Sequence, residues 1–190
     1  MPSSAKKSPL KKEPFFIERS KEKRKAFDEV MAALPADTTI VYVDECGINK
    51  HLSREYGRSL RGKRVHLPVH GRKYKKLNIV AALRNNEMIC TLEYECNTTS
   101  KLFSDWFENT LCKALEPSSV VVLDNATFHS KTKLKEIADR FNIRIIWLPP
   151  YSPDKNPIEK CWANLKNWLR LWAKKYDSIQ DAITAYFKRK

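Results

Sequence analysis

Two long apolar runs constrain the fold of this chain more than any other feature of its sequence. "TIVYVDE" (39–45) and "SSVVVLDN" (118–125) are rich in β-branched residues, and each reaches an acidic residue at its end. A strand with one solvated face alternates apolar and polar residues, whereas a continuous apolar run is typical of a strand buried on both faces. We therefore predict two buried strands that finish at Asp44 and Asp124.

The periodicity of the remaining sequence places helices and further strands around these two runs. Apolar residues at helical spacing predict helices over residues 27–34, 102–115, 134–141, 158–172 and 179–186. Ser100 is the expected cap of the second helix, and "SIQD" is a capping box before the last. Further strands are predicted at "LPVHG", "LNIVAAL", "EMICTLEYE" and "IRIIWLP". This order of elements predicts an α/β fold, in which helices pack on a mixed sheet.

A proline-rich stretch leads into the helix over 158–172. "LPPYSPDKNPIEKCW" (148–162) holds four prolines in fifteen residues and places Glu159 at the start of that helix. One interpretation is local: Asn156 caps the helix, Pro157 takes its first position, and Glu159 completes a variant capping box. The other is functional. Glu159 lies about 100° around the helix from the apolar stripe, so it can reach over the end of a sheet.

Asp44, Asp124 and Glu159 are therefore candidates for a shared site. Taken singly, each aspartate is a common turn former, but ligands of open α/β sheets collect at the carboxyl ends of strands. Three carboxylates are hard oxygen ligands of the kind that Mg²⁺ or Mn²⁺ accepts, and two such ions can clamp both oxygens of a phosphodiester displacement. Glu45 is expected on the opposite face of its strand, and we leave it out of the site.

The charge of the chain favours a polyanionic partner. Lys and Arg number 36 against 22 acidic residues, a net charge of +14. Residues 58–76 hold eight basic side chains and no acidic one, which suits phosphate binding without sequence preference, although basic runs also serve solubility. The DNA-contacting set that we predict is Arg58, Arg61, Lys63, Arg64, Arg72, Lys73, Lys75 and Lys76.

Length and cysteine usage limit the remaining possibilities. At 190 residues the chain suits one domain, which we place at residues 19–190 behind a basic tail or linker at 1–18. No apolar run approaches the ~18 residues of a membrane span. The five cysteines are scattered and form no C-x-x-C pair, so we expect reduced thiols and a cytoplasmic protein. Because the expected partner is DNA, we expect the protein to be associated with the nucleoid.

Three sequence blocks carry a family resemblance. "VYVDECGI", "VVLDNATFH" and "LPPYSPDKNPIEKCWANLK", in that order, resemble the signature blocks of the DDE transposases of bacterial insertion sequences, in the branch related to the mariner elements. The third block is long and specific, and Asp124 and Glu159 are separated by thirty-four residues, a spacing found in that branch. The resemblance extends over roughly residues 20–187.

The resemblance implies a ribonuclease H-like fold with Asp44, Asp124 and Glu159 as a catalytic triad that binds two Mg²⁺ or Mn²⁺ ions. It implies cut-and-paste transposition, with strand cleavage at transposon ends and strand transfer into TA targets, by an enzyme that dimerises on DNA. Asn125 and His129 are the expected supporting residues, although each is also a common loop residue.

The resemblance also raises an expectation about partners, and it leaves two rival functions. Transposases of this kind carry helix-turn-helix units before the catalytic domain, so we expect such a unit from an upstream reading frame or a missing part. One rival is a catalytically idle DNA-binding or regulatory protein derived from a transposase. The other is a different ribonuclease H-like nuclease, against which the proline block argues.

Overall fold

The computed structural model describes residues 20–49 and 76–189. Three predictions lie outside the described residues: the tail at 1–18, the strand at "LPVHG", and all of the DNA-contacting set except Lys76. Within the described part, five strands form one sheet. They are β1 (Ile40–Asn49), β2 (Lys76–Arg84), β3 (Glu87–Tyr94), β4 (Val120–Leu123) and β5 (Arg144–Trp147).

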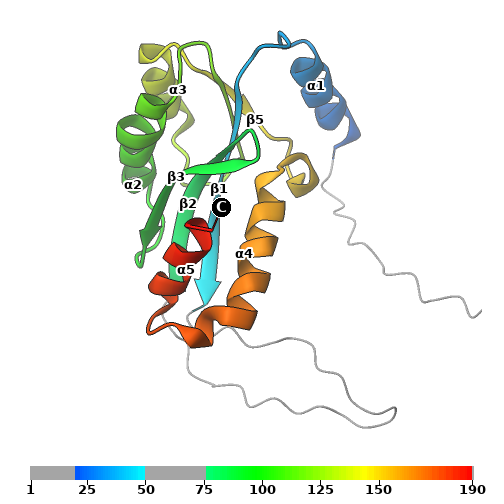
Figure 1. The fold of residues 1–190 in the computed structure, drawn as a ribbon. Coiled ribbons are helices and arrows are strands. Elements are labelled where there is room, and N and C mark those ends of the chain that lie inside the picture. Colours follow the sequence, from blue (N-terminus) through cyan, green and yellow to red (C-terminus); the bar gives the residue numbers. More distant parts are fainter. Residues whose placement is uncertain (1–19, 50–75, 190) are drawn as a thin grey trace, which may run out of the picture.

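The sheet is mixed, as the sequence predicts. Its order is β3-β2-β1-β4-β5, in which β1 pairs antiparallel with β2 and parallel with β4, and β5 is parallel to β4 (Figure 1). The helices are α1 (Lys21–Ala32), α2 (Ser100–Trp106), α3 (Lys131–Arg140), α4 (Ile158–Trp172) and α5 (Ile179–Phe187). A π-helical turn (Phe107–Cys112) continues α2, and 3₁₀ turns occupy Pro153–Lys155 and Ala173–Lys175.

Helices cover both faces of the sheet, which explains the continuous apolar strands. Alternate residues of β1 enter different cores: Val41 and Val43 pack with α2, its π-helical continuation and α3, whereas Cys46 and Ile48 pack with α4 and α5. Phe27 of α1 joins a third cluster beside β4 and β5. Burial of a strand on both faces requires apolar residues at nearly every position.

Strand β1 is longer than predicted. The apolar run predicts a strand that finishes at Asp44, but β1 continues to Asn49 because it pairs with β2 from Val41, opposite Arg84, to Asn49, opposite Lys76. Its parallel neighbour β4 is much shorter and ends at Leu123. Asp44 therefore lies within a strand, at the point where its neighbour stops.

Two details of the helices also differ from prediction. The cap of α2 is Thr99, whose hydroxyl accepts a hydrogen bond from the Leu102 N–H, and Ser100 is the first helical residue. Trp172 closes the apolar stripe in sequence but is 40% exposed, because the core ends one turn earlier at Leu169. The predicted cap of α5 is confirmed, since Ser178 accepts a hydrogen bond from the Asp181 N–H.

Candidate active site

The sheet places the two aspartates side by side. Tyr42 of β1 lies opposite Val122 of β4, so two residues further along these parallel strands are Asp44 and Asp124. Asp124 follows the last residue of β4, Leu123, and is free to turn away from the strand direction. The early end of β4 thus leaves an opening in front of Asp44.

Glu159 reaches the same opening from the start of α4. Ile158 of the apolar stripe is completely buried, while Glu159, the next residue, is exposed. The predicted capping box is wrong: no side chain caps α4, and the Asn156 Oδ1 atom is buried without a hydrogen-bond partner. Glu159 instead donates its backbone N–H to the Asn156 carbonyl oxygen at 3.2 Å. Its side chain is therefore not occupied in closing the helix terminus.

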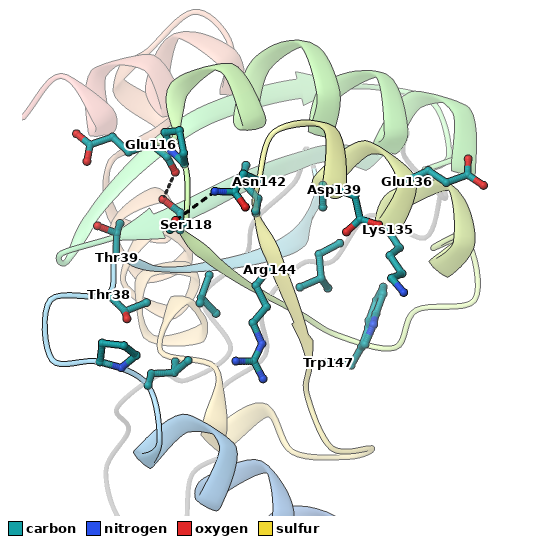
Figure 2. A pocket seen from close by; sticks show the side chains of 18 of the residues that line it. Thr38, Thr39, Glu116, Ser118, Lys135, Glu136, Asp139, Asn142, Arg144 and Trp147 are labelled. Carbon is teal, nitrogen blue, oxygen red and sulfur yellow. Dashed lines mark hydrogen bonds between the residues drawn. The ribbon is translucent and has the colours of Figure 1, made fainter.

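One hollow of about 410 Å³ brings the three carboxylates together. Its wall is the proline-rich segment, and its lining residues are Asp44, Asp124, Asn125, Ala126, Leu148, Pro149, Pro150, Tyr151, Ser152, Pro153 and Glu159. A larger hollow of about 1210 Å³ lies elsewhere, between α3, β5 and the connection before β1 (Figure 2). None of the three carboxylates lines this larger hollow.

The surroundings of Asp44 disfavour the ionised form of its carboxyl group. Burial, the charge of Glu159 and, more weakly, that of Asp124 raise the pKa of Asp44 to about 7. The indole of Trp162, on the next turn of α4, donates a hydrogen bond from Nε1 to Asp44 Oδ2 at 3.1 Å. This bond orients the carboxylate from the same helix that carries Glu159.

Asp124 is oriented by different partners. Its Oδ1 atom accepts hydrogen bonds from the Ala126 N–H at 3.0 Å and from His129 Nε2 at 3.1 Å. Burial raises the pKa of Asp124, but these two hydrogen bonds outweigh it, and the net pKa is lowered. The side chain of His129 is only 1% exposed and packs against the rings of Phe103 and Phe128.

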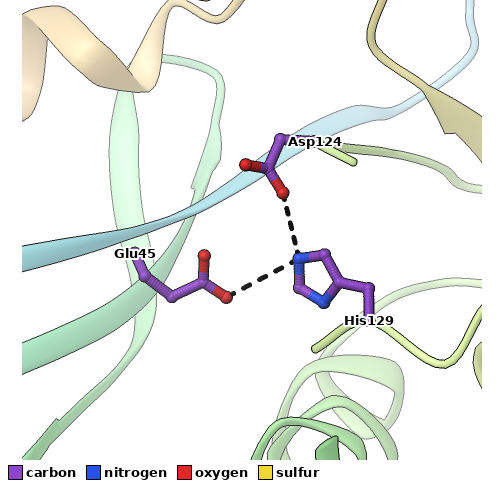
Figure 3. Close-up of side chains that lie close together, drawn as sticks. All are labelled: Glu45, Asp124 and His129. Atoms are coloured by element: carbon purple, nitrogen blue, oxygen red, sulfur yellow. Dashed lines mark hydrogen bonds and ion pairs between the residues drawn. The ribbon is translucent and has the colours of Figure 1, made fainter. Parts of the chain in front are cut away.

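Glu45 is a residue that the sequence analysis left out. Glu45 follows Asp44 directly in β1, so alternation assigns the two residues to opposite faces of the sheet. Past the end of β4, however, Asp124 and Glu45 lie on either side of His129, and Glu45 Oε1 is 3.8 Å from His129 Nε2 (Figure 3). That oxygen is buried and makes no hydrogen bond. Burial, with the charges of Asp124 and Asp44, raises the pKa of Glu45 to about 9. The sequence signal for Glu45 is its position directly after Asp44. Glu45 was excluded from the predicted site because adjacent residues of a strand point to opposite faces.

Glu45, Asp124 and His129 offer ligand atoms within 4.8 Å of one another, but His129 is better suited to holding Asp124 than to holding a metal. A metal on Nε2 would leave the ring proton on Nδ1, and Nδ1 is buried without a partner. Histidine ligands almost always donate that second N–H to an acceptor. The geometry therefore fits a hydrogen bond from Nε2 to Asp124.

Asn125 connects the ends of β4 and β5. Its side-chain nitrogen donates to the Leu148 carbonyl oxygen at 2.5 Å, and its oxygen accepts a hydrogen bond from Lys131 Nζ at 2.7 Å. The ammonium of Lys131 also lies 4.8 Å from the centre of the Trp147 ring. Asn125 therefore supports the wall of the hollow. Lys76, the described member of the predicted DNA-contacting set, is exposed at the start of β2.

The donor set fits divalent cations with hard oxygen ligands. Asp44, Asp124 and Glu159 supply carboxylate oxygens to one hollow, and burial together with the charge of Glu159 raises the pKa of Asp44. Mg²⁺ and Mn²⁺ accept one or two carboxylates together with water and phosphate oxygens. A cation in the hollow would remove the repulsion.

The chain is similar to a known protein family and to one bacterial protein. Residues 39–182 match the family model of the DDE superfamily endonucleases, as the three sequence blocks predict. A segment of 64 residues, 32% of the chain, is 44% identical to an uncharacterized protein of Sinorhizobium fredii, y4pE/y4sA. The chain covers 44% of that relative's length.

Three solved structures of the Mos1 transposase share the ribonuclease H-like fold. The strand transfer complex matches with a TM-score of 0.77 at 18% identity over 98% of this chain and 60% of that chain. The paired-end complex with the left transposon end matches at 0.72 and 15% identity, over 99% and 60%. The catalytic domain of the Mos1 mariner transposase matches at 0.62 and 13% identity, over 95% and 86%. The chain thus spans about three fifths of the transposase chains in the two complexes.

Proposed function

The chain belongs to the DDE superfamily endonucleases, and we propose that it is the catalytic domain of a cut-and-paste transposase. The observation that carries the proposal is the hollow that Asp44, Asp124 and Glu159 share. We assign the catalytic domain to residues 19–190, with residues 1–18 as a tail or linker. The reaction would cleave DNA at the ends of a mobile element and then join the freed 3′-hydroxyl to target DNA, at TA dinucleotides.

The protein's own groups have distinct tasks in this proposal. Asp44, Asp124 and Glu159 would hold two Mg²⁺ or Mn²⁺ ions, which when bound supply activation of the attacking water and stabilisation of the leaving oxygen. Trp162 orients Asp44, and His129 with the Ala126 N–H orients Asp124. Carboxylates held in this way need little reorganisation when substrate binds.

The proposed partner is DNA, as transposon ends and as target. Mos1, which shares the fold, was solved as a paired-end complex with a transposon end and as a strand transfer complex. We propose that a helix-turn-helix unit recognises the ends, that the protein dimerises on DNA, and that it acts in the cytoplasm at the nucleoid. No helix in the described part of the chain is long and apolar enough to cross a membrane.

Metal binding provides the direct test. Millimolar Mg²⁺ or Mn²⁺ is expected to raise the melting temperature of the protein, because an ion bound by the native state alone stabilises it by about 2.7 kcal/mol at 100 times its Kd. Thermal unfolding with and without chelator measures this shift. Asp44→Asn should show a smaller shift, whereas Asp177→Asn, at an exposed surface carboxylate, should behave like the wild type. An unchanged melting temperature in millimolar metal would contradict a preformed site.

Binding to duplex DNA is expected to depend steeply on salt and little on sequence. Basic residues that contact phosphates release counterions, and each contact contributes about 0.9 to the slope of log affinity against log salt. Replacing Arg72, Lys73, Lys75 and Lys76 together by Gln should lower that slope by up to about 3.6. Titrations of labelled duplexes of several sequences at three salt concentrations measure both quantities. Strong preference for one sequence at moderate salt would refute the expectation.

A further inference from the structure

Helix α1 is tied to the turn that precedes Glu159 by two crossed ion pairs. Arg24 forms a bidentate pair with Asp154, at 2.7 and 3.1 Å, and also donates a hydrogen bond to the Ser152 hydroxyl at 2.8 Å. In the reverse direction, Lys155 donates to both carboxylate oxygens of Asp28, at 2.6 and 2.8 Å. Each partner thus supplies one positive and one negative residue, which specifies the register of the helix against the turn.

The two pairs differ from an ordinary surface pair. Arg24 and Lys155 are only 20% and 25% exposed, although their partners Asp154 and Asp28 are 49% and 53% exposed, and each cation contacts both oxygens of its carboxylate. On the same helix, Lys25 and Glu29 form a pair at 3.7 Å whose members are 80% and 67% exposed. Exposed pairs of that kind contribute little, since water screens them. The contacts to the turn are the structurally significant ones.

The turn held in this way forms part of the active-site wall. Ser152 and Pro153 line the hollow with the three carboxylates, and the 3₁₀ turn Pro153–Lys155 ends four residues before Glu159. Backbone hydrogen bonds close the turn, from the Lys155 N–H to the Ser152 oxygen at 3.0 Å and from the Asn156 N–H to the Pro153 oxygen at 2.9 Å. A movement of the turn would therefore change where α4 begins.

The start of α4 lacks the support that helices usually have. No side chain caps α4, and the buried Asn156 Oδ1 atom makes no hydrogen bond. In contrast, α1 has an anchor of its own, because Phe27 is buried in a cluster with Leu148 and Ile146 beside β5. An anchored helix that holds the turn directly before an uncapped helix is suited to positioning the start of that helix.

We propose that Arg24 and Asp28 are positioning residues, which hold the turn at Ser152–Lys155 and through it set Glu159 against Asp44 and Asp124. The proposal rests on the proposed function, because it concerns the metal-binding geometry of that same site. In this proposal α1 contributes to the geometry of the active site without lining the hollow.

Charge reversal tests the proposal in the full chain. Asp28→Lys is expected to weaken Mn²⁺ binding by up to about tenfold, because removing a residue hydrogen-bonded to a metal ligand costs 10- to 100-fold and Asp28 acts one step further away, through Lys155. The double variant Asp28→Lys with Lys155→Asp restores the pair in reverse and should return the Kd to within about twofold of the wild type. Glu29→Lys changes the net charge by the same amount on the same helix and should leave the Kd unaltered. Calorimetric titration with Mn²⁺ measures all four proteins.

Amide hydrogen exchange supplies a readout that does not need metal. Exchange in residues 150–160 should be faster in Asp28→Lys, and in the milder Asp28→Asn, and should recover in the double variant. Wild-type Mn²⁺ affinity in Asp28→Lys, or a double variant as weak as the single one, would overturn the proposal. If the wild type itself bound no Mn²⁺, the proposed function would fail, and the exchange rates would still decide whether α1 holds the turn.

Discussion

Replacing Glu159 by glutamine is expected to abolish metal-dependent cleavage and strand transfer, with a loss of more than about 100-fold. Removal of an outer-shell partner alone costs 10- to 100-fold, and loss of a ligand charge should cost more. Glutamine keeps the shape of the side chain and suits the start of a helix, so the fold should survive. Asp44→Asn and Asp124→Asn are expected to give the same loss. The assay measures nicking and joining of a DNA that carries the element's ends, with the recognition unit supplied where needed.

This experiment also separates a catalyst from a DNA-binding relative that has lost activity. Salt-sensitive DNA binding should persist in all three variants, because the predicted phosphate-binding residues lie outside the triad. Lys160→Gln provides a matched control, since it changes one charge at the neighbouring exposed position of α4. Cleavage at the wild-type rate by Glu159→Gln would show that the carboxylate is not a ligand. A wild type that binds DNA and metal but never cleaves would favour the idle regulator.

Truncating Trp162 to alanine is expected to lower the free energy of unfolding by about 3–5 kcal/mol. Trp162 is 2% exposed and packs between α4 and the sheet, so its loss opens a large cavity. Trp162→Phe should cost less in packing, but it leaves Asp44 Oδ2 without the indole donor. The phenylalanine variant should therefore retain most of its stability while its metal affinity falls.

Urea denaturation at constant pH measures the first effect, and Mn²⁺ titration measures the second. Trp172→Ala is the control: it removes the same side chain from the same helix at a position that is 40% exposed. Its cost should be well below that at position 162, and about 0.5–1 kcal/mol of it is the contact between its ring and Lys175. If alanine at position 162 and alanine at position 172 lowered the free energy of unfolding equally, Trp162 would not be the core residue and Trp172 the surface residue that the structure shows.

Much of the fold was predictable because its signals are local. Continuous β-branched runs predicted strands buried on both faces, and the spacing of Ile158, Trp162 and Leu165 predicted the packed face of α4. The errors lie at the starts of helices. Thr99 rather than Ser100 caps α2, and Asn156 does not cap α4. Sequence rules place the start of a helix only to within one or two residues, so they cannot decide which of two neighbouring residues is its cap.

Most helices and strands, and the choice of Asp44, Asp124 and Glu159, follow from periodicity and motif spacing, which depend on neighbours along the chain. How those three carboxylates are held depends on packing between segments that are distant in sequence. The unequal lengths of β1 and β4 allow Asp124 to turn toward His129 and Glu45, and α1 meets the turn before Glu159 across more than a hundred residues of intervening chain. Such contacts depend on which surfaces pack together, and side-chain alternation within one strand carries no information about the end of its neighbour.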